Sequence, residues 1–297
     1  MPVFSFSYRP FEGKYIRRFR WWVVFLEEVR LWNRSRIFIV LFILGMLQPI
    51  ARFIQIILYN AAIQDPNHPL APLIRSVTWI KVDNELYFHF IRLQAPLVLL
   101  ILLYVGAGAI CADRKNRLWD IYFSKPIHWY DYLLGKLLSV VFCGFSLTFF
   151  PALILMLTDY TTKKSSTWLG LISYFPIVSD SLFFSLILVL PIALGIIAAS
   201  SIFSTENITV ISIVTLIIAN TSLAGLLSNF MRDGNYMQVS LPVAIYFMGQ
   251  RVFNIDRNIF FRTMDDINVT GMFLYIVSCC VLFLLISIIQ VRKAEKG

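Results

Sequence analysis

The chain has few charged residues: Asp, Glu, Lys and Arg make up only 14% of its 297 residues. A soluble protein contains about 25% charged residues. Hydrophobic residues make up 58% of the chain, and its mean hydropathy is +0.73. Because lipid replaces water around most side chains of a membrane protein, this composition excludes an ordinary soluble domain and predicts an integral membrane protein.

Histidine and cysteine are also scarce, with three and four residues. The histidines (His68, His89 and His128) lie far apart, and no Cys-x-x-Cys spacing occurs, so the sequence predicts neither a metal site nor a catalytic group. The net charge of +9 comes from basic residues at the ends of apolar runs. That placement is typical of membrane topology, and we expect no nucleic-acid partner.

The sequence lacks Gly-x-x-x-x-Gly-Lys-Ser/Thr, the motif whose backbone amides hold ATP phosphates. We therefore expect no cofactor in this chain. No chain of Asp, Glu or His and no buried acid pair is apparent in the apolar runs, which argues against a proton-coupled carrier. A pump built on this chain would take its energy from a partner protein.

Six apolar runs are each long enough to cross a bilayer, which takes about 20 helical residues at 1.5 Å each. These runs are residues 37–58, 93–112, 137–158, 182–202, 208–227 and 272–291. The fourth apolar stretch, residues 169–202, is too long for one crossing, so we place its membrane part at 182–202. We expect the preceding piece 173–180, broken by Pro176, to lie at the outer interface.

Two further segments are predicted to be helical without crossing. Apolar residues at spacings of three and four, such as Trp22, Phe25, Val29 and Trp32, predict an amphipathic helix within residues 14–36 that lies in the headgroup region. In the outer segment 228–270, Ser240 before Pro242 is typical of a helix start. We expect short helices there that re-enter the outer leaflet or cap the bundle.

The predicted fold is an all-α integral membrane protein of six transmembrane helices, with an amphipathic interfacial helix before them. We divide the chain into a tail and interfacial helix (1–36), a six-span domain (37–291) and a tail (292–297). The first 36 residues, the loop 113–136 and the last tail hold sixteen Lys and Arg, whereas the three opposite segments hold nine. Cytoplasmic segments are enriched in Lys and Arg, so both termini are predicted to be cytoplasmic.

The loop 113–136 is the most distinctive segment because it is longer than a chain reversal needs. It contains Asp-Arg-Lys-Asn-Arg-Leu-Trp-Asp (113–120), then Ser-Lys-Pro-Ile (124–127), then Asp-Tyr-Leu-Leu-Gly-Lys (131–136). This pattern, with the order of spans around it, resembles the ABC-2 type permeases, the membrane subunits of many ABC exporters. Asn116-Arg117-Leu118 stands where that family usually has Gly-Thr-Leu.

The resemblance implies an exporter subunit in the inner (plasma) membrane of a prokaryote. Its partners would be two copies of an ABC ATP-binding subunit, which hold the ATP and Mg, a second permease copy as a homodimer or related chain, and membrane lipids. The loop would carry a coupling helix that docks on the ATPase. In that role Trp119 would make the apolar contact and would be surrounded by a rim of charged residues. Pro126 would break the helix. The docking residues would be Asp113, Arg114, Arg117, Leu118, Trp119, Asp120 and Pro126.

Other interpretations stay open. The loop could be a solvated turn whose basic residues only set the topology. The chain could do mechanical or assembly work in the envelope without moving a solute, or it could be a secondary carrier or a membrane enzyme. Arg52 and Asn220 are candidates for lining a pathway. The simpler interpretations are that the Arg52 side chain reaches the membrane interface and that Asn220 forms a hydrogen bond to a neighbouring helix.

Overall fold

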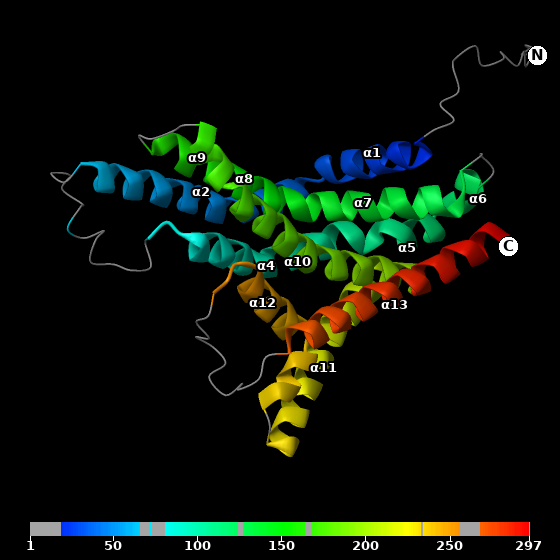
Figure 1. Ribbon diagram of the computed structural model, residues 1–297. Helices are drawn as coiled ribbons and strands as arrows, with labels where there is room; N and C mark the ends of the chain where they lie inside the picture. Colours follow the sequence, from blue (N-terminus) through cyan, green and yellow to red (C-terminus); the bar gives the residue numbers. More distant parts are fainter. Residues whose placement is uncertain are drawn as a thin grey trace, which may run out of the picture.

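The computed structural model describes residues 19–65, 72, 81–123, 127–163, 168–232, 234–255 and 268–296. Within these ranges the chain is helical, with short turns and no strand (Figure 1). The helices are α1 (Arg20–Asn33), α2 (Arg36–Gln64), α4 (Asn84–Gly106), α5 (Gly108–Lys115), α6 (Leu118–Phe123), α7 (Trp129–Leu147), α8 (Phe149–Thr162), α9 (Trp168–Ser173), α10 (Phe175–Ile202), α11 (Glu206–Met231), η2 (Gly234–Val239), α12 (Leu241–Val252) and α13 (Val269–Lys296).

Six helical stretches of the described chain are long and apolar enough to cross a membrane. They are 36–64, 84–115, 129–162, 175–202, 206–231 and 269–293. Among the described residues this confirms the predicted all-α fold and the six helices able to span a membrane, as expected of a multi-pass membrane protein. The second stretch begins nine residues before its predicted start, and the third begins eight residues before. The first residues of both stretches include polar side chains, which lower the local hydropathy on which the prediction was based. Leu86, Phe88 and Phe90, in the early turns of α4, are buried in the bundle.

Helix α10 lies at the centre of the bundle and packs against α4, α7, α11, α12 and α13. Glycines on the neighbouring helices permit close approach. A Cβ on Gly106 would lie 2.8 Å from Ile196, and one on Gly144 would lie 2.5 Å from Val189. Both contacts are closer than side chains tolerate, so these glycines set the distance between the helices.

The break expected at Pro176 does not occur. Helix α10 is continuous from Phe175, and Pro176 lies in its first turn, where a proline has no helical hydrogen bond to lose. The predicted short helices in the segment 228–270 are present as η2 and α12. Ser240 precedes α12 with an extended backbone, and Pro242 again falls in the first turn.

The bundle has two ends that matter for function (Figure 1). One end, here called the loop end, holds α1, α5, α6 and the end of α13. The other, the far end, holds the end of α2, the start of α4 and α9. The apolar faces of α2, α11 and α13 are largely exposed, including Ile43, Ile218 and Leu282. Exposed apolar helix faces of this kind suit contact with lipid.

Candidate docking site at the loop end

The loop after the second span consists of two short helices joined by a tight turn. Helix α5 ends at Lys115, and Arg117 takes a left-handed backbone with φ 53° before α6 begins. Lys115, Asn116 and Arg117 are exposed. The turn therefore presents two positive charges outward at the loop end.

Asp113, by contrast, is buried, with 7% of its surface exposed. Its Oδ2 lies 2.6 Å from Lys136 Nζ and accepts a hydrogen bond of 2.8 Å from the Tyr132 hydroxyl. Lys136 is 1% exposed and also lies 2.5 Å from Glu28 Oε1. A buried lysine of α7 thus holds one acid from α1 and one from α5.

Trp119 extends this arrangement to α6. Its Nε1 donates a 3.2 Å hydrogen bond to the Tyr132 hydroxyl, and its ring is half-buried against the chain's own core. Glu28, Asp113, Trp119, Tyr132 and Lys136 form one connected group, here called the charged cluster. It joins α1, α5, α6 and α7, which are four separate elements of the fold.

The charged cluster holds two acids and one base away from water. Burial raises the pKa of Glu28 above its ordinary value, and the nearby Lys136 only partly opposes this shift. A single ammonium is shared between two carboxylates, so a proton on Glu28 makes the cluster electrically neutral. Breaking such a buried arrangement leaves an uncompensated charge, which costs about 3–5 kcal/mol.

Helix α1 comes close enough to reach Lys136 because residue 135 is glycine. A Cβ at Gly135 would lie 2.6 Å from Val24 Cβ and 2.8 Å from the Trp21 carbonyl oxygen. The α1 side chains that face α7, Val24 and Phe25, are buried. Gly135 and Lys136 together therefore seat the amphipathic helix on the third span.

Arg114 serves a different purpose. Its guanidinium donates to the carbonyls of Ser201 at 3.1 Å and Ile202 at 3.0 Å, and to that of Phe203. These are terminal carbonyls of α10, which have no partner within the helix and carry the negative end of its dipole. Arg114 therefore fixes α5 to the end of the central helix.

A groove of about 380 Å³ lies between α5 and the turn that joins α10 to α11. Its walls include Lys115 and Asn116 on one side and Thr205 and Glu206 on the other. The groove and the exposed turn 115–117 form a continuous polar surface at the loop end, here called the groove surface.

The structure exposes some of the predicted docking residues and buries others. Asp113 and Arg114 are engaged inside the molecule, so they are not part of an exposed rim, and Trp119 packs inward. Arg117 is exposed, and Leu118 is half-buried at the start of α6. The backbone of Asp120 lies in α6, but its side chain and Pro126 fall outside the described residues.

Arg52 and Asn220 lie away from this site. Arg52 donates a 2.6 Å hydrogen bond to Gln55 in the same helix. Asn220 donates a 3.0 Å bond to the Tyr275 hydroxyl of α13 and accepts a 2.7 Å bond from the Leu241 amide. The predicted hydrogen bond from Asn220 to a neighbouring helix is confirmed.

Sequence reasoning missed Glu28, Tyr132 and Lys136 as partners in one buried group. The two acids of that group, Glu28 and Asp113, lie outside the apolar runs, where no buried acid pair is apparent. The available signal was Lys136 itself, a base followed directly by an apolar run, where an unpaired charge is costly. No group of three or more His, Cys, Asp or Glu in the described residues could hold a metal ion. Comparisons with protein-family models and with curated proteins find no match.

Proposed function

We propose that the chain is the membrane-spanning subunit of an exporter driven by a separate ATP-binding subunit. Two ATP-binding subunits would dock at the loop end, and two permease copies would form the passage through the membrane. The protein would lie in the inner membrane of a prokaryote with the loop end in the cytoplasm. The excess of Lys and Arg in the segments at this end supports that orientation.

The observation that carries the proposal is the charged cluster. A coupling device must transmit movement from a docked partner to the spanning helices, which requires rigid contacts between them. The hydrogen bonds and ion pairs run from Trp119 in α6 through Tyr132 and Asp113 to Lys136 and Glu28. A force on α6 would reach the third span and α1 through these buried contacts.

The partner would contact the groove surface, since Asp113 and Trp119 are turned inward. Lys115 and Arg117 offer exposed positive charges that suit an acidic surface on the partner. Such exposed charges contribute more to the rate and specificity of association than to its strength. Apolar contacts from α6 would have to supply part of the affinity.

The test is co-purification from native membranes in mild detergent. We expect a stoichiometric ATP-binding subunit with the unaltered chain and loss of most of it from the double variant Lys115→Glu, Arg117→Glu. Arg232→Glu, which reverses an exposed charge at the other end of α11, is the matched control and should keep the partner. A chain that purifies alone, under conditions that keep other complexes intact, would overturn the proposal.

A proton-coupled carrier is the second candidate, because the shared ammonium and two acids of the charged cluster could exchange a proton. The buried acids of the described residues lie at opposite ends, with Glu28, Asp113 and Asp131 at the loop end and Asp159 at the far end. That distribution leaves a long apolar interval between them, so we rank this candidate second. Transport that follows a pH gradient without nucleotide and is lost in Glu28→Gln would favour it.

A further inference from the structure

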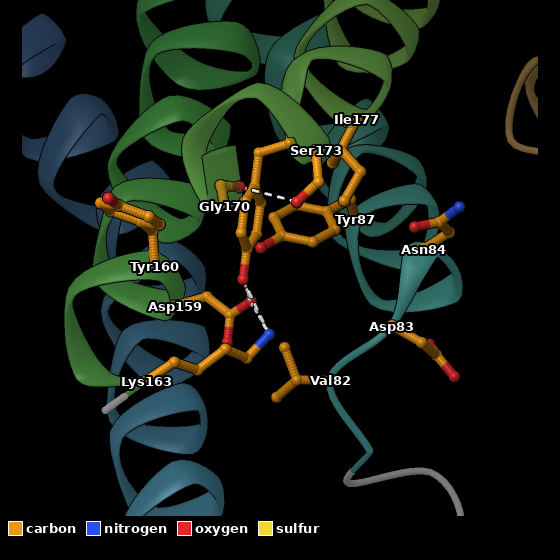
Figure 2. Close-up of a pocket in the computed structure, with 11 residues that line it drawn as sticks. Val82, Asp83, Asn84, Tyr87, Asp159, Tyr160, Lys163, Gly170, Ser173 and Ile177 are labelled. Carbon is orange, nitrogen blue, oxygen red and sulfur yellow. Dashed lines mark hydrogen bonds and ion pairs between the residues drawn. The ribbon is translucent and has the colours of Figure 1, made fainter. Parts of the chain in front are cut away.

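A second polar site lies at the far end, away from the charged cluster. A pocket of about 400 Å³ is bounded by the end of α8, the start of α4, and α9 with the first turn of α10. Figure 2 shows its centre, where Asp159 and Lys163 from the end of α8 meet Tyr87 from α4. The side chains of Val82 and Ile177 form an apolar part of the pocket wall.

Asp159 is the fixed element of this pocket. It is 2% exposed, and its carboxylate accepts hydrogen bonds from Asn60 at 2.9 Å and from the Tyr174 hydroxyl at 2.7 Å. Asn60 is itself 3% exposed. The carboxylate therefore has two hydrogen-bond donors in addition to the cation beside it. The Tyr174 hydroxyl also accepts a 2.7 Å hydrogen bond from Lys163 Nζ, whereas Asn60 holds the carboxylate without contact to the cation.

Lys163 is the movable element. Its Nζ lies 2.7 Å from Asp159 Oδ2 and 5.3 Å from the centre of the Tyr174 ring, yet its side chain is 44% exposed. It follows Asp159 by four residues at the end of α8, so rotation of its own side chain is enough to withdraw the ammonium into solvent. An ammonium that left would vacate a place bounded by a buried acid and an aromatic ring.

Tyr87 provides a second observation, independent of Asp159 and Lys163. It is 1% exposed, its ring points from α4 toward the middle of the pocket, and its hydroxyl has no hydrogen-bond partner among the described residues. A buried hydroxyl without a partner costs about 1–3 kcal/mol. A ligand with a polar group at this point would satisfy it.

We propose that this pocket binds an alkylammonium group, with the Lys163 side chain occupying the same place when the ligand is absent. The buried acid favours a cation over an anion, since an anion would lie against the carboxylate of Asp159. A primary ammonium can donate to Asp159 and to the Tyr87 oxygen, while the Tyr174 ring attracts its charge. The alkyl part would lie against Val82 and Ile177.

This site does not depend on the proposed exporter function, because binding there needs no ATPase. The probe is n-butylammonium, which matches the part of the Lys163 side chain beyond Cα. Binding is measured by saturation-transfer NMR on the full chain in lipid nanodiscs of phosphatidylglycerol. n-Butanol and butyrate serve as the uncharged and anionic comparisons, and neither should bind.

Lys163→Ala should bind n-butylammonium about fivefold more tightly, because the internal competitor is gone. Lys293→Ala is the matched control: it removes an exposed lysine near the end of α13, which does not line the pocket. Its affinity should equal that of the unaltered chain. Equal affinity in the Lys163 and Lys293 variants would overturn the idea that Lys163 competes.

Asp159→Asn should weaken binding at least tenfold, since a charge-assisted bond becomes a neutral one. Because Asp159 also joins helices, Tyr87→Phe gives a second test that leaves the fold intact. Removing the unpartnered hydroxyl should leave thermal stability unchanged or higher and still weaken binding a few-fold. No binding of n-butylammonium to the unaltered chain or to the folded Lys163→Ala variant, or preferential binding of butyrate, would refute the ammonium site.

The source of the ammonium, a free amine or a lipid headgroup, is distinguished by adding phosphatidylethanolamine to the nanodiscs. A headgroup ligand would displace n-butylammonium in proportion to the lipid added. A free amine would leave the probe's affinity unchanged by the lipid. Either result keeps the alkylammonium assignment and identifies where the group comes from.

Discussion

Lys136 Nζ lies 2.5 Å from Glu28 Oε1, so a lysine at the start of the third span is joined directly to the amphipathic helix α1. The same nitrogen lies 2.6 Å from Asp113 of α5. Three elements of the loop end thus meet on one ammonium that is almost entirely shielded from solvent. The strength and pH dependence of this contact can both be measured.

Replacing Lys136 by Met should destabilise the protein by about 3–5 kcal/mol, because two carboxylates then stay buried without a cation. The measurement is equilibrium unfolding in mild detergent. Lys293→Met removes an exposed lysine near the end of α13 and should change stability by less than about 0.5 kcal/mol. Adding Glu28→Gln and Asp113→Asn to Lys136→Met should restore part of the loss. An unchanged stability in Lys136→Met would show that the ion pairs are not formed.

Glu28 should make stability depend on pH. Its pKa is raised in the folded protein, chiefly by burial, so the folded state binds more protons than the unfolded state above the ordinary value of 4.5. Stability from this group is therefore present at low pH and falls as pH rises from the unfolded pKa through the folded one. Glu28→Gln cannot titrate, so the difference in unfolding temperature between it and the unaltered chain should change with pH across that window. A constant difference would contradict the shift.

Much of the fold could be predicted from the sequence because lipid imposes a simple rule on each span. A run of about 20 apolar residues has few alternatives in a bilayer, so the six spans and the short helices before the last one were found. The starts of α4 and α7 were missed because there the helix is buried against protein. Leu86 and Phe88 lie beside Glu85 and His89, and a hydropathy average does not separate the two faces.

The charged cluster could not be predicted, since it depends on which helices lie side by side. Glu28 and Lys136 are 108 residues apart, and nothing local to either of them indicates the other. Asp113 and Trp119 were placed on an exposed surface because charged and aromatic residues in a loop usually face outward or toward a partner. In the structure, Tyr132 offers both of them a hydrogen-bond partner inside the chain.

Gly135→Ala should separate α1 from α7, because the new Cβ would meet backbone as well as side-chain atoms. The Trp21 carbonyl oxygen would lie 2.8 Å away and cannot turn aside. Overpacking of this kind costs about 1–3 kcal/mol. Gly225→Ala is the matched control, since nothing lies within 4 Å of its added Cβ and alanine favours a helix by about 1 kcal/mol. The two variants should change the unfolding temperature in opposite directions, and a stable Gly135→Ala protein would argue against close packing of α1.

Asn220→Leu should loosen the segment before the last span. The amide joins α11 to the Tyr275 hydroxyl and to the Leu241 amide at the start of α12. Hydrogen bonds between membrane helices contribute about 0.6–2 kcal/mol, so the loss of stability should fall in that range. Thr158→Val removes a hydroxyl that, among the described residues, bonds within its own helix to the Ile154 carbonyl, and should cost less. If Asn220 instead lines a pathway, the variant would change transport of the passenger while its unfolding temperature stayed the same.

Trp119→Phe should reveal whether movement at α6 is transmitted to α1. Phenylalanine keeps most of the half-buried ring but cannot donate the 3.2 Å hydrogen bond to Tyr132. Trp119 is linked to Glu28 through Tyr132, Asp113 and Lys136, and the Lys136 ammonium also lies 5.4 Å from the centre of the Tyr132 ring. Distant, unconnected positions give additive changes within about 0.3–0.5 kcal/mol, whereas members of one network deviate by about 0.5–3 kcal/mol.

We therefore expect the double variant Trp119→Phe, Glu28→Gln to be non-additive in unfolding free energy. The pair Trp119→Phe, Lys163→Ala, at opposite ends of the bundle, should be additive. Additivity in both pairs would mean that the charged cluster fastens four elements together without coupling them, and the mechanical argument for an ATPase-driven exporter would lose its structural support.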